Sequence, residues 1–230
     1  VIWGRTASTF DRAADVIFLT NYFSTKVGQG FDSGKFSARA YCAVLFRIGC
    51  EPILIADDPD VRSEVVSVSD FRVASDPVVT LVDTLENFKI FGEVGFVGSD
   101  FFPMKYWNEL ENTTPNITWK VCDDLVRCGR MIKSREEQEV IRIAGQIASP
   151  AMTHMIEALI SGKTEAEAAG LAAHDIVSAG GIIDKIQVSH GKTIGFTCGD
   201  PLAGYRKVAP KIGDLFRAFL ICLLYTSDAA

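Results

Sequence analysis

Residues 130–145 read RMIKSREEQEVIRIAG, and this stretch decides how the chain is divided. Ser134 and Glu137 have the spacing of a capping box, in which the serine hydroxyl and the glutamate carboxylate each bind a free amide at a helix start. Apolar residues then recur at three- and four-residue steps as far as Leu159, which predicts one long helix. Pro150 lies inside this helix and is expected to bend or loosen it, because proline removes an amide donor.

A second helix is predicted directly after the first. The turn at residues 161–163 is followed by Thr164 and Glu167, which form another capping box. This helix is expected to run to about Ser178, where the glycines at 180 and 181 stop it. Strands are expected at residues 186–189, 193–197 and 215–220. From about residue 128 onward, the sequence therefore predicts a helix pair followed by strands.

Strands and helices alternate in the part of the chain before residue 128. Apolar and β-branched runs predict strands at residues 15–20, 41–46, 52–56, 93–97 and 117–122, the second and third of which form a hairpin. Helices are predicted at residues 59–66, 78–91 and 103–111, and a glycine-rich loop at 28–34. Such alternation is typical of a sheet covered by helices. The predicted fold class is α/β, with a mixed-sheet domain followed by the first part of an α+β domain.

Composition excludes several classes of function. The 230 residues are 48% hydrophobic and 23% charged, which is typical of a folded globular protein. The formal net charge is -6 and the basic residues are scattered, so neither nucleic acid nor a membrane surface is an expected partner. The most apolar run, 218–225, is far shorter than the roughly 20 residues of a membrane-spanning helix. Six cysteines without a C-x-x-C pair, and no visible signal peptide, favour a cytoplasmic protein.

The order of several motifs resembles the pita-bread family, which includes aminopeptidase P, prolidase and creatinase. These motifs are Leu19-Thr-Asn-Tyr22, the hairpin through Gly49 and Pro52, Arg130-Met-Ile-Lys-Ser134 with Glu136 and Glu137, Gly162-Lys-Thr-Glu165, and Gly213-Asp-Leu215. Each motif alone is common, and their order and spacing carry the resemblance over residues 10 to 217. It implies a creatinase-like N-terminal domain at residues 1–127 and an incomplete pita-bread catalytic domain at 128–220. It also implies that the full-length parent protein forms a homodimer.

The resemblance implies that the parent is a hydrolase of C–N bonds, similar to a metal-dependent Xaa-Pro aminopeptidase or prolidase. Peptidases of this family bind two divalent ions, such as Mn, Co or Zn, through two Asp, one His and two Glu. The ions activate a water molecule and polarise the scissile carbonyl. These ligands are expected downstream of Leu220, so the present chain is expected to hold no metal and to be inactive. The expected substrate is a small peptide or another small molecule.

One departure from the family pattern leaves alternatives open. The first metal-binding aspartate of the peptidase branch is expected at about position 219, where this chain has Phe219. Either the parent is a creatinase-like hydrolase of a small amidino compound or compatible solute without the metal pair, or the sequence has already left its natural frame there. A non-catalytic binding or dimerisation relative is a further alternative. Residues 221–230 resemble the translation of an adapter used in DNA library preparation, which predicts a non-native tail.

Three residues are candidates for the functional site. His190 follows a predicted strand and is the candidate catalytic residue, although a hydrogen-bonded structural histidine is the commoner case. Tyr205 and Arg206 lie near the place where the family has an upstream histidine. They are candidates for binding a substrate carboxylate, which a guanidinium group holds through two hydrogen bonds. The alternative is that they form an ordinary loop pair.

Four other polar residues are expected to be structural. His154 and His174 lie in helices beside apolar positions and have no metal-binding companion at a suitable spacing. Asp123 and Asp124 precede a helical turn, where acidic residues usually cap the helix or face solvent.

Overall fold

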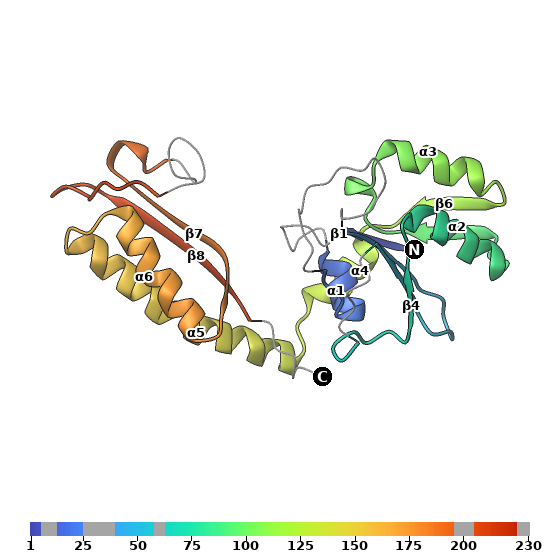
Figure 1. Ribbon diagram of the computed structural model, residues 1–230, viewed down its shortest axis with the longest axis horizontal. Coiled ribbons are helices and arrows are strands. Elements are labelled where there is room, and N and C mark those ends of the chain that lie inside the picture. Colours follow the sequence, from blue (N-terminus) through green and yellow to red (C-terminus); the bar gives the residue numbers. More distant parts are fainter. Residues whose placement is uncertain (6–12, 25–39, 58–62, 196–204, 225–230) are drawn as a thin grey trace. The chain divides into compact units, whose positions relative to one another are not determined.

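The computed structural model describes residues 1–5, 13–24, 40–57, 63–195 and 205–224. They belong to two compact units, Val1–Ile132 and Lys133–Ala230 (Figure 1). The division lies after Ile132 rather than after residue 127, because the last helix of the first unit is part of that unit's core through Val126. Within the described ranges, no helix is both long and apolar enough to cross a lipid bilayer.

The first unit is built on a mixed β-sheet, which confirms the predicted class. Its strands are β1 (Ile2–Arg5), β2 (Tyr41–Leu45), β3 (Ile53–Ala56), β4 (Asp70–Val73), β5 (Gly92–Phe96) and β6 (Ile117–Val121). Strands β1, β2, β3 and β4 are neighbours in that order, with only β3 and β4 parallel, and β5 pairs with β6 in parallel. A parallel bridge between Ile2 and Val97 connects β1 to the end of β5. The predicted hairpin is confirmed, with Leu45 opposite Ile53.

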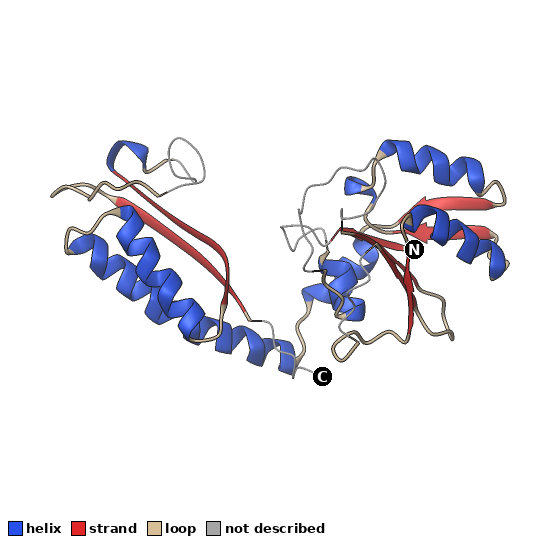
Figure 2. Ribbon diagram, in the orientation of Figure 1, coloured by secondary structure: helices blue, strands red, loops and turns tan. Residues whose placement is uncertain are grey.

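Helices cover both faces of this sheet (Figure 2). They are α1 (Ala14–Thr20), α2 (Pro77–Asn87), the 3₁₀ turn η1 (Ser99–Phe101), α3 (Met104–Thr113) and α4 (Asp124–Met131). Successive side chains of a strand point to opposite faces. On β2, Ala43 and Leu45 therefore pack in the core that α2 and α3 cover. Cys42 and Val44 pack in the second core, which α1 and α4 cover.

The prediction of a strand at residues 15–20 is wrong, since this segment is helix α1. A short apolar run does not by itself distinguish a strand from a helix. The helix buries Val16 and Thr20, which are four residues apart, and the Thr20 hydroxyl donates to the Val16 carbonyl at 2.7 Å. In a strand, Phe18 would share the face of these two residues. Here its side chain is 46% exposed, and Asp15 is free to pair with Arg130 of α4 at 2.6 Å.

Three more predictions differ in detail. The predicted helix at 78–91 is α2, which ends at Asn87, shortly before Lys89 takes a left-handed φ of 51°. Of the helix predicted at 59–66, residues 63–65 form a turn and residue 66 has no regular structure, and the preceding residues lie outside the described part of the chain. The loop predicted at 28–34 also lies outside it. Strands β1 and β4 and the full extent of α4 were not predicted, because their short runs have no clear periodicity.

The second unit packs two helices on one face of a two-stranded sheet (Figure 2). Its elements are α5 (Arg135–Ile160), α6 (Glu165–Ser178), β7 (Ile182–His190), the 3₁₀ turn η2 (Gly191–Thr193) and β8 (Phe216–Leu223). Both predicted capping boxes are present, and α5 continues through Pro150. The core between helices and sheet includes Met155 and Leu159 of α5, Ile176 of α6, and Val188 of β7.

The strands of this unit run antiparallel, with Gln187 opposite Phe219 and His190 opposite Phe216. The strand predicted at 193–197 is wrong in its described part. There the chain leaves β7 at Gly191, whose φ is 57°, and turns through η2. Strand β8 is longer than predicted, because residues 221–223 of the expected non-native tail pair with β7. The origin of the tail stays a prediction.

Candidate functional site

The sequence candidates of the second unit meet at the first turn of α6. Thr164 caps this helix, and its hydroxyl accepts from the Glu167 amide while the Glu167 carboxylate accepts from the Thr164 amide at 2.8 Å. The capping box fixes Glu165 as the first helical residue. Its side chain is fully buried and points to the end of β7, where His190 is 5% exposed.

Glu165, His190 and Arg206 form one buried ionic group, here named the Glu165 cluster. The Glu165 Oε1 atom lies 2.7 Å from His190 Nδ1. Arg206 donates from Nε to Oε2 at 2.9 Å and from Nη2 to Oε1, so its guanidinium group binds the carboxylate through two parallel hydrogen bonds. The Arg206 amide also donates to Oε2, at 3.3 Å. The carboxylate is therefore shared by two cationic or polar partners from different segments.

The contacts determine the protonation of the cluster. Burial alone raises the pKa of the Glu165 carboxyl, but its hydrogen bonds to Arg206 and His190, together with their charges, outweigh burial and hold the pKa below its usual range. An ionised carboxylate only accepts hydrogen bonds, so His190 carries a proton on Nδ1. Arg206 Nη2 lies 3.3 Å from the same nitrogen, and both donors converge on the carboxylate between them.

These positions bear directly on the predicted roles. His190 has the same strand parity as Ile186 and Val188, which pack in the core against α5 and α6, so it lies on the helix-covered face of the sheet. The guanidinium fork of Arg206, predicted to bind a substrate carboxylate, holds the carboxylate of Glu165. Both residues are well placed to stabilise the fold. Catalysis by His190 and substrate binding by Arg206 stay predictions.

Tyr205 is connected to the same region but not to the carboxylate. Its hydroxyl donates to the carbonyl of Ile186 on β7 at 2.8 Å, and its side chain remains partly exposed. Partial burial raises the pKa of the Tyr205 phenol. The structure thus brings His190 and Arg206 into contact and places Tyr205 beside them as a tie to the strand. Its predicted substrate contact stays untested.

Sequence reasoning missed Glu165. The residue is part of the Gly162-Lys-Thr-Glu165 motif, and an acidic residue in the first turn of a helix is common because it complements the helix dipole. Nothing in the local pattern shows that this carboxylate is buried, since its partners come from residues 25 and 41 positions later in the chain. The Thr164 capping box predicts where the helix begins, whereas the contacts of Glu165 with His190 and Arg206 are seen only in the fold.

The polar residues expected to be structural are all engaged at the surface or between segments. Asp175 lies between two exposed histidines, 2.6 Å from His154 Nδ1 and 3.2 Å from His174 Nδ1. Asp123 accepts hydrogen bonds from Gly98 and Ser99 and so connects the end of β5 to α4. Asp124 pairs with Arg127 at 2.6 Å on the surface of α4. Each of the four residues therefore has a partner within its own unit.

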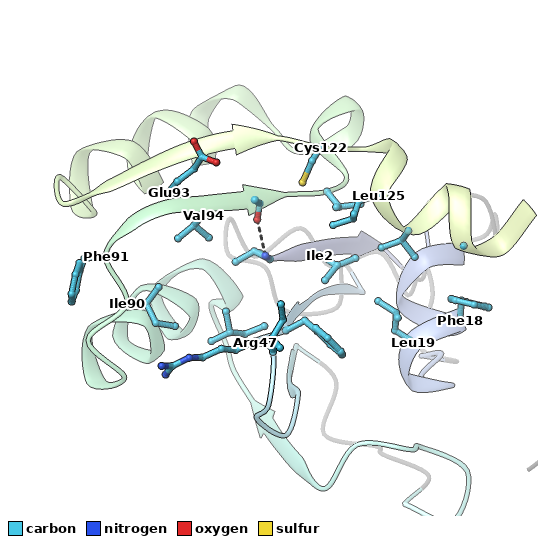
Figure 3. Close-up of a pocket in the computed structure, with 18 of the residues that line it drawn as sticks. Ile2, Phe18, Leu19, Arg47, Ile90, Phe91, Glu93, Val94, Cys122 and Leu125 are labelled. Atoms are coloured by element: carbon cyan, nitrogen blue, oxygen red, sulfur yellow. Dashed lines mark hydrogen bonds between the residues drawn. The ribbon is translucent and has the colours of Figure 1, made fainter.

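An apolar pocket lies in the first unit, whereas all three sequence candidates belong to the second unit. Its volume is about 900 Å³, and its walls include Phe18 and Leu19 of α1, Ile90 and Phe91 before β5, and Leu125 of α4 (Figure 3). The backbone nitrogen of Val1 lies at this pocket and donates to the Gly95 carbonyl at 2.7 Å.

The described residues do not supply a metal centre. No three His, Cys, Asp or Glu side chains among them are grouped so that they could hold a metal ion. Phe219, at the position where the resemblance places the first metal-binding aspartate, lies on β8 opposite Gln187 and is 43% exposed. Its phenyl ring has no donor atom for a cation, so the two-ion site does not fit the residues that the structure describes.

The solved structures that are similar to this chain over nearly its whole length include those of three peptidases. The X-Pro aminopeptidase from Thermotoga maritima superposes with a TM-score of 0.68 at 17% identity, covering 95% of this chain and 57% of its own. The prolidase from Pyrococcus horikoshii gives 0.66 at 18% identity, covering 97% and 56%. The Xaa-Pro dipeptidase from Bacillus anthracis gives 0.66 at 17% identity, covering 98% and 56%.

Sequence comparison adds no relative to these structures. No protein-family model matches the chain, and no curated protein matches it. At 17% to 18% identity, similarity to the solved structures establishes the fold. This chain has the fold of the pita-bread family, in which those aminopeptidases and prolidases belong, and it spans a little more than half of their length.

Proposed function

We propose that the chain is part of a hydrolase of C–N bonds whose substrates are Xaa-Pro peptides. One observation carries the proposal: over 95% to 98% of its length the chain is similar in fold to an X-Pro aminopeptidase, a prolidase and an Xaa-Pro dipeptidase. The order of motifs from Leu19 to Leu215 supports it independently, because those motifs are local sequence features and not superposed coordinates. Fold alone does not determine chemistry, so the reaction needs a direct test.

The proposal places the reacting centre outside the described residues. Two divalent ions, Mn, Co or Zn, would be bound in the parent by Asp, His and Glu side chains downstream of Leu220. When bound, such ions supply an activated water and polarise the carbonyl of the scissile bond. No catalytic step is assigned to the described residues, because no three His, Cys, Asp or Glu side chains among them are grouped to hold a metal ion. The Glu165 cluster connects α6 to His190 of β7 and to Arg206.

The first experiment uses the chain of 230 residues. It is purified without chelator, loaded in turn with Mn²⁺, Co²⁺ and Zn²⁺, and assayed with several Xaa-Pro dipeptides by release of free proline. The expected result is no metal-dependent turnover. Turnover that a chelator abolishes and that metal restores would contradict the placement of the ligands downstream of Leu220, because the chain itself would then contain a working site.

The second experiment tests the activity itself. The gene is read without interruption past Asp214, and the encoded protein is expressed with its own continuation. The expected continuation contains Asp, Asp, His, Glu and Glu in that order, and the longer protein is expected to hydrolyse Xaa-Pro dipeptides only when metal is present. A continuation without these residues, together with metal-free protein, would contradict the metallopeptidase proposal.

Phe219 favours a second candidate, a creatinase-like hydrolase of a small amidino compound or compatible solute that uses no metal pair. The two candidates differ in the metal content of the longer protein and in the effect of a chelator on turnover. A non-catalytic relative would turn over neither class of substrate. A homodimeric state and a cytoplasmic location are further parts of the proposal, and light scattering of the longer protein tests the first.

A further inference from the structure

Residues Tyr205–Val208, here named the strap, lie along the first turn of α6. The Glu165 amide donates to the Val208 carbonyl at 3.2 Å, and the Ala166 amide donates to the Arg206 carbonyl at 3.1 Å. The first amides of a helix have no partner within the helix. Backbone carbonyls of the strap therefore complete the hydrogen bonding of this helix end.

The Glu165 side chain makes the reverse set of contacts. Its carboxylate accepts from the Arg206 amide, from Nε and from Nη2, so one buried acidic group receives three donors of the strap. Hydrogen bonds in which both partners are charged are about twice as strong as neutral ones. The backbone contacts are neutral and the side-chain contacts are ionic, so the carboxylate is the strongest attachment of the strap to α6.

The remaining attachments of the strap are weaker or lie at its ends. The Tyr205 hydroxyl donates to the Ile186 carbonyl, and Arg206 Nη2 reaches the His190 carbonyl at 3.4 Å. Among the residues that the structure describes, the guanidinium group of Arg206 from the strap and the imidazole of His190 from β7 face the Glu165 carboxylate. On its own helix, Glu167 is turned to the Thr164 cap instead. The helix pair packs through a separate apolar core.

We propose that Glu165 is a positioning residue that acts as a latch, holding the strap on α6 through Arg206. Loss of the carboxylate charge releases the strap locally, and the helix pair stays folded. Release of the strap and unfolding of the helix pair depend on different contacts. The strap is attached mainly by one ionic group, whereas α5 and α6 are held together by buried apolar side chains. This inference does not depend on the proposed function.

Opening of the strap can be followed by trypsin digestion, because trypsin cleaves after Arg206 and Lys207. The experiment is limited trypsin digestion of the native chain, with the rate at these two bonds followed by mass spectrometry. In E165Q, which changes the charge and hardly the shape, cleavage there is expected to be about tenfold faster or more, since proteolysis follows the population of the open form. Helical circular dichroism is expected to persist.

The matched control is E167Q, which removes a carboxylate from the same helical turn without touching the strap. Its cleavage rate is expected to stay within about twofold of the rate of the unmodified chain. The change expected for E165Q is about tenfold, which corresponds to about 1.4 kcal/mol. A second variant, R206K, retains the charge and the trypsin site but loses the planar fork, so it is also expected to open the strap.

Three outcomes would overturn the proposal. The first is E165Q with normal helical signal and unchanged cleavage at the strap. The second is equal acceleration in E167Q, which would mean that any charge loss at this helix end suffices. The third is cleavage spread along α5 and α6, which would mean that opening is not local. If E165Q does not fold, the R206K variant is the test. Failure of R206K to fold, or a normal cleavage rate at its strap, also counts against the latch.

Discussion

Alanine substitutions at two adjacent residues of α5 are expected to differ strongly in their effect on stability, because one residue lies in the core of the second unit and the other at its surface. Leu159 is 2% exposed and packs between the helices and the sheet, whereas Ile160 is 73% exposed. Leu159→Ala is expected to cost about 3 kcal/mol of the free energy of unfolding, because such changes lose burial and leave a cavity. In a unit of this size, about 3 kcal/mol corresponds to a fall in Tm of roughly 12–24 °C.

Ile160→Ala is the matched control, with an expected change within about 0.5 kcal/mol. Thermal unfolding is followed by circular dichroism, which reports on the helices of both units. Tryptophan fluorescence is recorded in parallel, because Trp3, Trp107 and Trp119 all lie in the first unit. Leu159→Ala is expected to lower the midpoint seen by circular dichroism. Equal losses for the two substitutions would refute the assignment of Leu159 to a packed core.

Three further predictions test other parts of the fold. Pro150→Ala is expected to raise the free energy of unfolding by about 1–3 kcal/mol, measured with urea, because it restores a helical hydrogen bond. Gly98→Ala is expected to cost about 2–3 kcal/mol by fluorescence, since φ is 94° and a Cβ would lie 2.6 Å from the Trp3 carbonyl oxygen. The pKa of the Glu165 carboxyl is lower in the folded state than its ordinary value of 4.5. Its contribution to the free energy of unfolding is therefore present above pH 4.5 and is lost as the pH falls through the lowered pKa. Thermal melts of the unmodified chain and of E165Q, at pH 7 and at pH 3, measure this contribution.

Under the proposed function, the described residues have structural roles and the metal ligands lie further along the parent chain. The described part of the second unit supplies a helix pair, two strands and an ionic group that holds the connecting segment. The donors of a metal site would come from elsewhere. The experiments on turnover therefore need the longer protein, whereas those on stability and on the latch use the chain as it stands.

Local chemistry explains the predictions that are confirmed. The capping boxes at Ser134 and Thr164 need only residues three positions apart, so their spacing gave both helix starts. The hairpin ending at Leu45 and Ile53 was likewise visible as two apolar runs close together. The order of these local motifs also gave the family resemblance, which the fold comparison supports.

The sequence by itself determined the α/β class, the two-part organisation and the boundaries that local capping controls. Tertiary structure alone decided that residues 14–20 form a helix, because burial of Val16 and Thr20 and the ion pair of Asp15 depend on distant segments. It also decided that Glu165 is buried with His190 and Arg206. Solvent exclusion and charge pairing depend on which segments meet in space, and a one-dimensional pattern records only which residues are neighbours in the chain.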